Sequence, residues 1–206
     1  MVERALILVD LQNDFMPGGA LEVANGGQIV PVANAIISKF DLVVATQDWH
    51  PLDHGSFVTQ NASKKVGDVI ELGGIEQVVW PVHCVQGSDG AAFHASLDRS
   101  GITDVFQKGT SRRVDSYSGF FDNDHEKSTG LGDYLKGRAV RRIYIMGLAT
   151  DYCVKFTALD AVELGFETSV VEDGCVGVEL NAGDVEAAFT EMRRAGVRCV
   201  RSADVE

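Results

Sequence analysis

The sequence of 206 residues lacks any long, uninterrupted hydrophobic run. Its N-terminal apolar stretch covers only residues 5–9, whereas a membrane span needs about 20 apolar residues. The small-residue cleavage site and longer apolar region of a secretory signal are also missing. Linkers, repeats and low-complexity tracts are absent as well. Because this length fits one domain, we expect a single domain over residues 1–206 with no membrane partner.

Positive charge is scarce in this chain. The 18 Lys and Arg residues face 30 Asp and Glu residues, which gives a net charge of −12. That balance argues against nucleic-acid backbones and anionic membranes as partners. Cysteine is scarce too, with four residues and no CxxC pair, so a disulfide framework is not expected. We therefore expect a cytoplasmic protein whose thiols stay reduced.

Short apolar runs alternate with segments of helical periodicity along the chain. The apolar runs predict strands over residues 5–9, 42–45, 102–106, 143–146, 168–171 and 197–200. Helices are predicted near residues 28–38, 128–136, 151–164 and 183–195. This alternation indicates βαβ units. The expected fold is α/β, with three α/β/α layers around a mostly parallel central sheet of about six strands.

Three reactive side chains follow predicted strands. Asp10 ends the run ALILV, Lys108 follows ITDVFQ, and Cys153 follows IYIMGLAT. Ligands of parallel sheets bind outside the carboxyl ends of the strands, so we expect these groups to meet at one edge. Each alone is more often structural: a turn carboxylate, a solvated amine or a buried thiol. Their convergence favours a catalytic site.

The surroundings of Cys153 predict a nucleophile. Thr150 is expected to cap the following helix, which would put Cys153 in its first turn. The helix N-terminus and a nearby lysine would favour the thiolate, and backbone N–H groups there could hold an oxyanion. Asp10 can accept the thiol proton and return it to a leaving amine. The other cysteines are predicted to be structural: Cys84, Cys175 and Cys199.

Two loops carry a possible metal site. Asp48 and His50 stand two residues apart in TQDWHPLDHGSF, and His83 comes from WPVHCVQG. This donor set suits one divalent ion, with zinc as the first choice and iron or manganese as alternatives. His54 is left open as a fourth ligand or a supporting residue, as is Ser56. Two histidines lack an Asp-x-His context and are left out of the set: His94 and His125.

Large aromatic side chains near these loops have two interpretations. Phe15, Trp49 and Trp80 are first expected to be core packing, as large rings usually are. Phe15 and Trp80, however, each follow closely on a candidate catalytic loop. A flat heteroaromatic substrate would stack on such rings.

Six motifs spread across most of the chain form a recognisable set. They are ILVDLQNDFMPGGAL at 7–21, TQDWHPLDHGSF at 46–57, WPVHCVQGSDGAAF at 80–93, FQKGT at 106–110, VDSYSGFFDN at 114–123 and GLATDYCVKFTA at 147–158. Together and in this order they resemble the nicotinamidase/pyrazinamidase group of the isochorismatase-like cysteine hydrolase superfamily. The resemblance implies hydrolysis of nicotinamide to nicotinate and ammonia through a thioester, a step of NAD salvage, with pyrazinamide as a further substrate.

The resemblance also implies residue roles, matched motif by motif. The catalytic triad of the family falls on Asp10, Lys108 and Cys153, and its metal ligands fall on Asp48, His50 and His83. The oxyanion hole corresponds to the backbone N–H groups of Ala149 and Cys153, beside a cis peptide at Leu148–Ala149. In the family the metal holds the pyridine nitrogen. The substrate-binding residues implied are Phe15, Trp80 and Tyr117.

Three alternatives remain at this point. The chain could be a related cysteine hydrolase acting on a different small amide, or a hydrolase whose metal activates the attacking water. It could also be a small-molecule binding module with an inactive site. Homo-oligomers are neither indicated nor excluded by the sequence.

Overall fold

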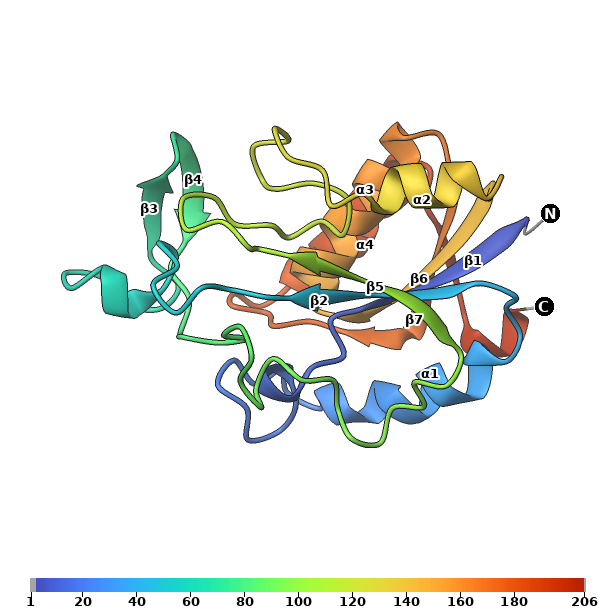
Figure 1. Ribbon diagram of the computed structural model, residues 1–206, viewed down its shortest axis with the longest axis horizontal. Helices are drawn as coiled ribbons and strands as arrows, with labels where there is room; N and C mark the ends of the chain where they lie inside the picture. Colours follow the sequence, from blue (N-terminus) through green and yellow to red (C-terminus); the bar gives the residue numbers. More distant parts are fainter. Residues whose placement is uncertain (1–2, 206) are drawn as a thin grey trace.

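The computed structural model describes residues 3–205, and its centre is a six-stranded parallel sheet (Figure 1). The strand order is β5-β2-β1-β6-β7-β8, so the chain leaves β1 toward one edge and later crosses to the other. This confirms the predicted α/β sheet. The strands are β1 (Arg4–Val9), β2 (Val43–Asp48), β5 (Ile102–Lys108), β6 (Arg142–Leu148), β7 (Glu167–Val176) and β8 (Arg198–Val200).

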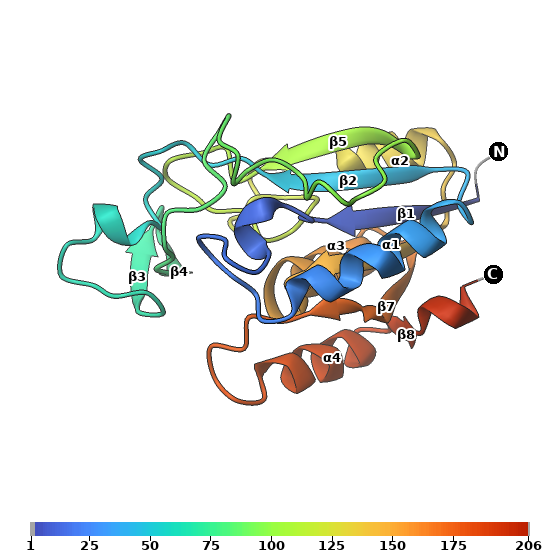
Figure 2. The same cartoon turned by 90° about the horizontal axis from the view of Figure 1, so that it is seen from below.

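Helices cover both faces of the sheet (Figures 1 and 2). Helix α1 (Ile29–Ile37) packs on one face, against the side chains of Leu6 and Leu8 in β1. The other face, with Ile7 and Val9, carries α2 (Leu131–Gly137), α3 (Lys155–Glu163) and α4 (Asp184–Arg194). Because β1 alternates between the two cores, its residues 5–9 are fully buried, as a continuous apolar run predicts. Within residues 3–205, no helix has the length and apolar character needed to cross a bilayer.

A small antiparallel hairpin was not predicted. It consists of β3 (Val69–Leu72) and β4 (Ile75–Val78), joined at Gly73 and Gly74. Both glycines have positive φ angles, +65° and +90°, which suits a tight hairpin turn. The strands are short and only Gln77 in them is buried, so they carry no strong apolar pattern. The hairpin projects beyond the carboxyl edge of the main sheet (Figure 2).

The turn that follows β6 differs from the expectation. Thr150 is not a helix cap: Ala149, in extended backbone, is the cap residue, and its carbonyl accepts hydrogen bonds from the N–H groups of Tyr152 and Val154 (both 3.1 Å). A π-helical turn over Thr150–Val154 thus precedes α3. The Leu148–Ala149 peptide bond is cis, as the resemblance implied. Cys153 consequently lies in a wide turn rather than in the first turn of a capped α-helix.

We expect Gly147→Ala to destabilise the sheet centre. Gly147 has a φ of +138°, and a Cβ there would lie 2.0 Å from the carbonyl oxygen of Val9. Overpacking and backbone strain together predict a loss of about 3 kcal/mol or more in the free energy of unfolding. Urea denaturation measures this change.

The matched control is Gly137→Ala at the end of α2. A Cβ at Gly137 meets no atom within 4 Å, so this substitution should be neutral or stabilise by up to about 1 kcal/mol. Equal stability of the two variants would contradict the proposed close contact between β1 and β6.

Candidate active site

Four buried polar side chains meet at the carboxyl ends of the parallel strands. Asp10 follows β1, Asp48 ends β2 and Lys108 ends β5. Cys153 comes from the π-turn after β6. All four residues are at most 7% exposed. Asp10, Lys108 and Cys153 therefore meet at one edge of the sheet, as the sequence predicted.

The ammonium group of Lys108 lies at the centre of this group. Its Nζ is 2.9 Å from Asp10 Oδ2 and donates a hydrogen bond of 3.4 Å to Cys153 Sγ. It also donates to Asp48 Oδ1 and, at 2.9 Å, to the carbonyl oxygen of Ser116. Lys108 is 1% exposed, so these contacts replace the water that an exposed amine would have. One cation thus joins a thiol to two carboxylates.

Asp10 has the electrostatics of a base for use near neutral pH. Burial raises its pKa to about 6, Lys108 opposes this shift, and the nearby carboxylate of Asp48 adds to it. The hydroxyl of Thr46 donates a 2.6 Å hydrogen bond to Asp10 Oδ1, which favours the ionised form. At pH 7 this carboxyl group is mostly ionised and able to accept a proton.

The thiol of Cys153 does not have the lowered pKa that the sequence predicted. Burial raises its pKa well above the usual value, and the attraction of Lys108 offsets only part of that shift. Asp10 raises it further. The resting thiol is therefore protonated, and its proton must leave during the reaction, toward a neighbouring base.

Asp48 links the triad to a second set of donors. Its Oδ1 accepts from Lys108, while its Oδ2 lies 3.5 Å from His50 Nε2 and 3.8 Å from His83 Nε2. Ligand atoms of Asp48, His50 and His83 all lie within 4.8 Å of one another. Burial alone would raise the pKa of Asp48, but Lys108 and His50 hold it well below its usual range. The carboxylate stays ionised, as a metal ligand must.

The histidines are oriented as metal ligands. His50 Nδ1 is 2.9 Å from the carbonyl oxygen of Gly109, and His83 Nδ1 is 2.8 Å from that of Pro81. Each Nδ1 must carry a proton to donate to its carbonyl, so Nε2 is the ring nitrogen that faces Asp48 and that a metal ion could bind. Burial and the neighbouring His50 lower the pKa of His83 to about 4, so its ring is neutral. These residues fit a divalent metal ion.

Two residues that the sequence did not indicate make hydrogen bonds to the segments that carry Asp48 and His83. The Gln12 side chain accepts from the N–H of Asp48 and donates to its carbonyl oxygen, both at 2.8 Å. The carboxylate of Asp14 accepts a 2.7 Å hydrogen bond from the N–H of Cys84, next to His83. Both lie in the loop after β1, and only the motif ILVDLQNDF signals them. They fix the backbone beside two of the candidate metal ligands, Asp48 and His83.

His54 and Ser56 lie next to His50 and bond to each other. His54 Nδ1 lies 2.8 Å from Ser56 Oγ and accepts from the Ser56 N–H at 3.2 Å. Its Nε2 faces the carbonyl oxygen of Val114 at 3.4 Å. Both ring nitrogens are thus engaged, and the ring packs 4.6 Å from that of His50. In this arrangement the ring of His54 packs against that of His50.

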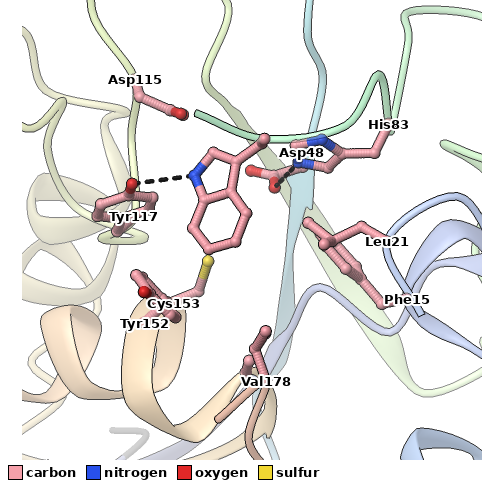
Figure 3. Close-up of a pocket in the computed structure, with 11 residues that line it drawn as sticks. Phe15, Leu21, Asp48, His83, Asp115, Tyr117, Tyr152, Cys153 and Val178 are labelled. Atoms are coloured by element: carbon pink, nitrogen blue, oxygen red, sulfur yellow. Dashed lines mark hydrogen bonds and ion pairs between the residues drawn. The ribbon is translucent and has the colours of Figure 1, made fainter. Parts of the chain in front are cut away.

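A cavity, with about 350 Å³ of empty space including its open mouth, is lined by Cys153 and by two of the candidate metal ligands, Asp48 and His83. Figure 3 shows the Cys153 sulfur pointing into it, between Phe15 on one side and Tyr117 on the other. Trp80 Nε1 donates to the Tyr117 hydroxyl at 3.0 Å. The lining residues are Phe15, Leu21, Asp48, Trp80, His83, Asp115, Tyr117, Ala149, Tyr152, Cys153 and Val178.

The aromatic predictions divide accordingly. Phe15 and Trp80 line the cavity, as does Tyr117, whereas Trp49 packs against the core and lines a separate surface hollow. Asp115 was missed by the sequence analysis although its carboxylate also faces the cavity. It accepts hydrogen bonds from the Ser116 N–H (2.8 Å) and from Gln77 of β4 (3.2 Å). The hairpin therefore reaches the site through Gln77.

Residues 4–204 match the family model of the isochorismatase domain. The chain belongs to the isochorismatase family. Among curated family members, a nicotinamidase from Escherichia coli (strain K12) is 48% identical over 210 residues, covering 100% of this chain and 98% of that protein. The range matched by the family model, residues 4–204, contains every residue of the site described above.

Solved structures of the family agree with this relationship. An Acinetobacter baumanii nicotinamidase/pyrazinamidase superposes with a TM-score of 0.97 at 44% identity, covering 100% of this chain and 99% of that one. A pyrazinamidase of Pyrococcus horikoshii in complex with zinc gives a TM-score of 0.78 at 41% identity, covering 97% and 99%. The predicted fold class is confirmed, and a divalent metal is supported.

We expect Gly109→Ala to weaken metal binding without removing a ligand. Gly109 has a φ of +64°, and a Cβ there would lie 2.3 Å from Cε1 of His50. The ring would have to move away from Asp48, which should lower the affinity for divalent metal by about tenfold or more. Metal content after dialysis against a metal buffer measures this.

Gly87→Ala is the matched control. Gly87 also has a positive φ (+76°), but a Cβ there meets no atom within 4 Å. It therefore imposes similar backbone strain with no clash, and metal content should match the unmodified protein. Equal loss of metal in both variants would contradict the role given to the His50 contact.

Proposed function

We propose that this chain is a metal-containing cysteine amidohydrolase that converts nicotinamide and water to nicotinate and ammonia, and that it also accepts pyrazinamide. The proposal rests on one observation: Cys153, which Lys108 joins to Asp10, lines the same cavity as Asp48 and His83. The reaction belongs to NAD salvage. Nicotinamidases 40–48% identical to the chain support this assignment.

The unit that performs this function is proposed to be one domain over residues 1–206, located in the cytoplasm. The family match over residues 4–204 supports the single domain. All four cysteines are free, which fits a reducing compartment.

The substrate would lie flat between aromatic walls. Phe15 and Trp80 line the cavity, and Tyr117 holds Trp80 through a hydrogen bond. A bound divalent ion, proposed to be zinc, would supply a positive charge that holds the ring nitrogen and orients the ring. Two imidazoles and a carboxylate are a donor set typical of zinc. The carboxamide would then face the sulfur of Cys153.

The first half of the reaction transfers the acyl group to sulfur. Asp10 takes the proton of the Cys153 thiol as the sulfur attacks the carboxamide carbon. Lys108 contacts both groups and favours the negative charge that develops on sulfur. The backbone N–H groups of Ala149 and Cys153 are proposed to hold the oxyanion. The C–N bond then breaks, and Asp10 returns the proton to the departing ammonia, leaving a thioester.

The second half releases the acid. Asp10, ionised again, takes a proton from water as the water oxygen attacks the thioester carbon. The C–S bond breaks, and the proton held by Asp10 returns to the sulfur of Cys153. The acid that forms gives its own proton to solvent and leaves as nicotinate. A pKa of about 6 suits Asp10 for giving and taking a proton near neutral pH.

Cys153→Ala should abolish hydrolysis while the fold is retained. Without sulfur no thioester forms, so ammonia release from nicotinamide should fall by about a thousandfold or more. Cys199→Ala, at a cysteine on β8, is the control and should keep its turnover. Substantial turnover in Cys153→Ala that disappears on metal removal would instead favour a metal-activated water as the nucleophile.

Metal removal should weaken the binding of nicotinamide. Calorimetry with the Cys153→Ala protein separates binding from turnover, and the loss of the ion should lower nicotinamide affinity by about tenfold or more. Benzamide, which lacks the ring nitrogen, serves as the control ligand and should bind equally with and without metal. Unchanged nicotinamide affinity after verified metal removal would refute the orienting role of the ion.

A further inference from the structure

A second cluster of possible metal ligands lies outside the cavity. It consists of Asp160 and Glu163 on α3 and His125 in the loop that leads to α2. None of these residues lines the cavity around Cys153. The cluster has no part in the proposed hydrolysis.

The geometry of the cluster is that of a three-donor site. Asp160 and Glu163 stand three positions apart on α3, so both side chains project from the same face of the helix. His125 Nε2 lies 3.4 Å from Asp160 Oδ1, and one ligand atom from each residue lies within 4.8 Å of the others. An ion bound between them would bridge α3 to the loop.

Asp160 provides an independent sign of a missing ligand. The residue is only 5% exposed, and within residues 3–205 its buried Oδ2 has no hydrogen-bond partner. Burial raises the pKa of this carboxyl; the Ser118 hydroxyl and His125 oppose the shift, and Glu163 adds to it. Leaving a buried carboxylate oxygen unpaired beside a second carboxylate is costly. A cation bound here would neutralise the charges of Asp160 and Glu163 and give Oδ2 a partner.

We propose that His125, Asp160 and Glu163 bind a second divalent ion of the zinc type, separate from the ion at Asp48, His50 and His83. An imidazole nitrogen with two carboxylates suits zinc and similar first-row ions better than magnesium or calcium, which prefer oxygen donors alone. Glu163 and His125 are exposed, so the ion can enter from solvent and keep water in its remaining positions.

The loop that this ion would fasten supports one wall of the cavity. The His125 N–H donates to the carbonyl oxygen of Asp122 at 2.8 Å, and its ring stacks on Phe121 with centroids 5.2 Å apart. In the same loop, Asn123 Oδ1 accepts from the N–H of Tyr117 at 2.8 Å. The second ion would therefore stabilise the segment that positions Tyr117, without contacting the substrate.

Metal counting tests the proposal. Equilibrium dialysis of the full chain against buffered free zinc, followed by mass-spectrometric metal analysis, should find about two ions per chain and about one in His125→Ala. Asp160→Asn, of nearly equal volume, should give the same loss. Glu126→Gln is the control, because it removes an acid from the same exposed loop. This variant should still bind about two zinc ions per chain.

Repeating the zinc count in a His83→Ala variant, which lacks a ligand of the first site, separates the second site from the hydrolase site. There, about one ion should remain, and adding His125→Ala should remove it. Equal zinc content in His125→Ala and the unmodified chain, or anomalous scattering that places the second ion away from Asp160, would overturn the proposal. Neither result would bear on the hydrolysis proposed for Cys153.

Discussion

The rest of the site depends on the contacts of the buried ammonium group of Lys108. It contacts Asp10, Asp48 and Cys153 together, in a place where no water can replace those contacts. Two carboxylates so close would repel each other, and burial would drive both toward the neutral form. The cation offsets this effect unequally: Asp48 stays ionised, as the proposed metal ligand must, while the pKa of Asp10 remains near 6. One charge thus sets two different roles.

The parallel sheet brings these groups together because their strands are neighbours. β5, β2, β1 and β6 are consecutive in the sheet, so their carboxyl ends form one continuous edge. The order reverses around β1, which opens space at that edge for a ligand. Loops then refine the positions: Gln12 ties the end of β1 to Asp48, and Asp14 ties it to the segment of His83.

The sequence predicted those site residues whose positions are set by the ends of strands. Asp10, Lys108 and Cys153 were found because buried strands show as apolar runs and parallel strands end together. Side-chain to backbone contacts, such as those of Gln12, leave no periodic signal, and neither does the exposed β3–β4 hairpin. The pKa of Cys153 was predicted in the wrong direction, because a local helix argument does not include burial. Thr150 was misassigned because its preference for capping yielded to a π-turn.

The central claim is that the thiol held by Lys108 carries the acyl group of the substrate. Partitioning with hydroxylamine tests it most directly, because a shared thioester must divide between water and hydroxylamine in the same way whatever its leaving group. The account predicts one constant ratio of nicotinohydroxamate to nicotinate from nicotinamide and from methyl nicotinate. A ratio that differs between these two substrates, or nicotinate formed with no hydroxamate at all, would contradict it.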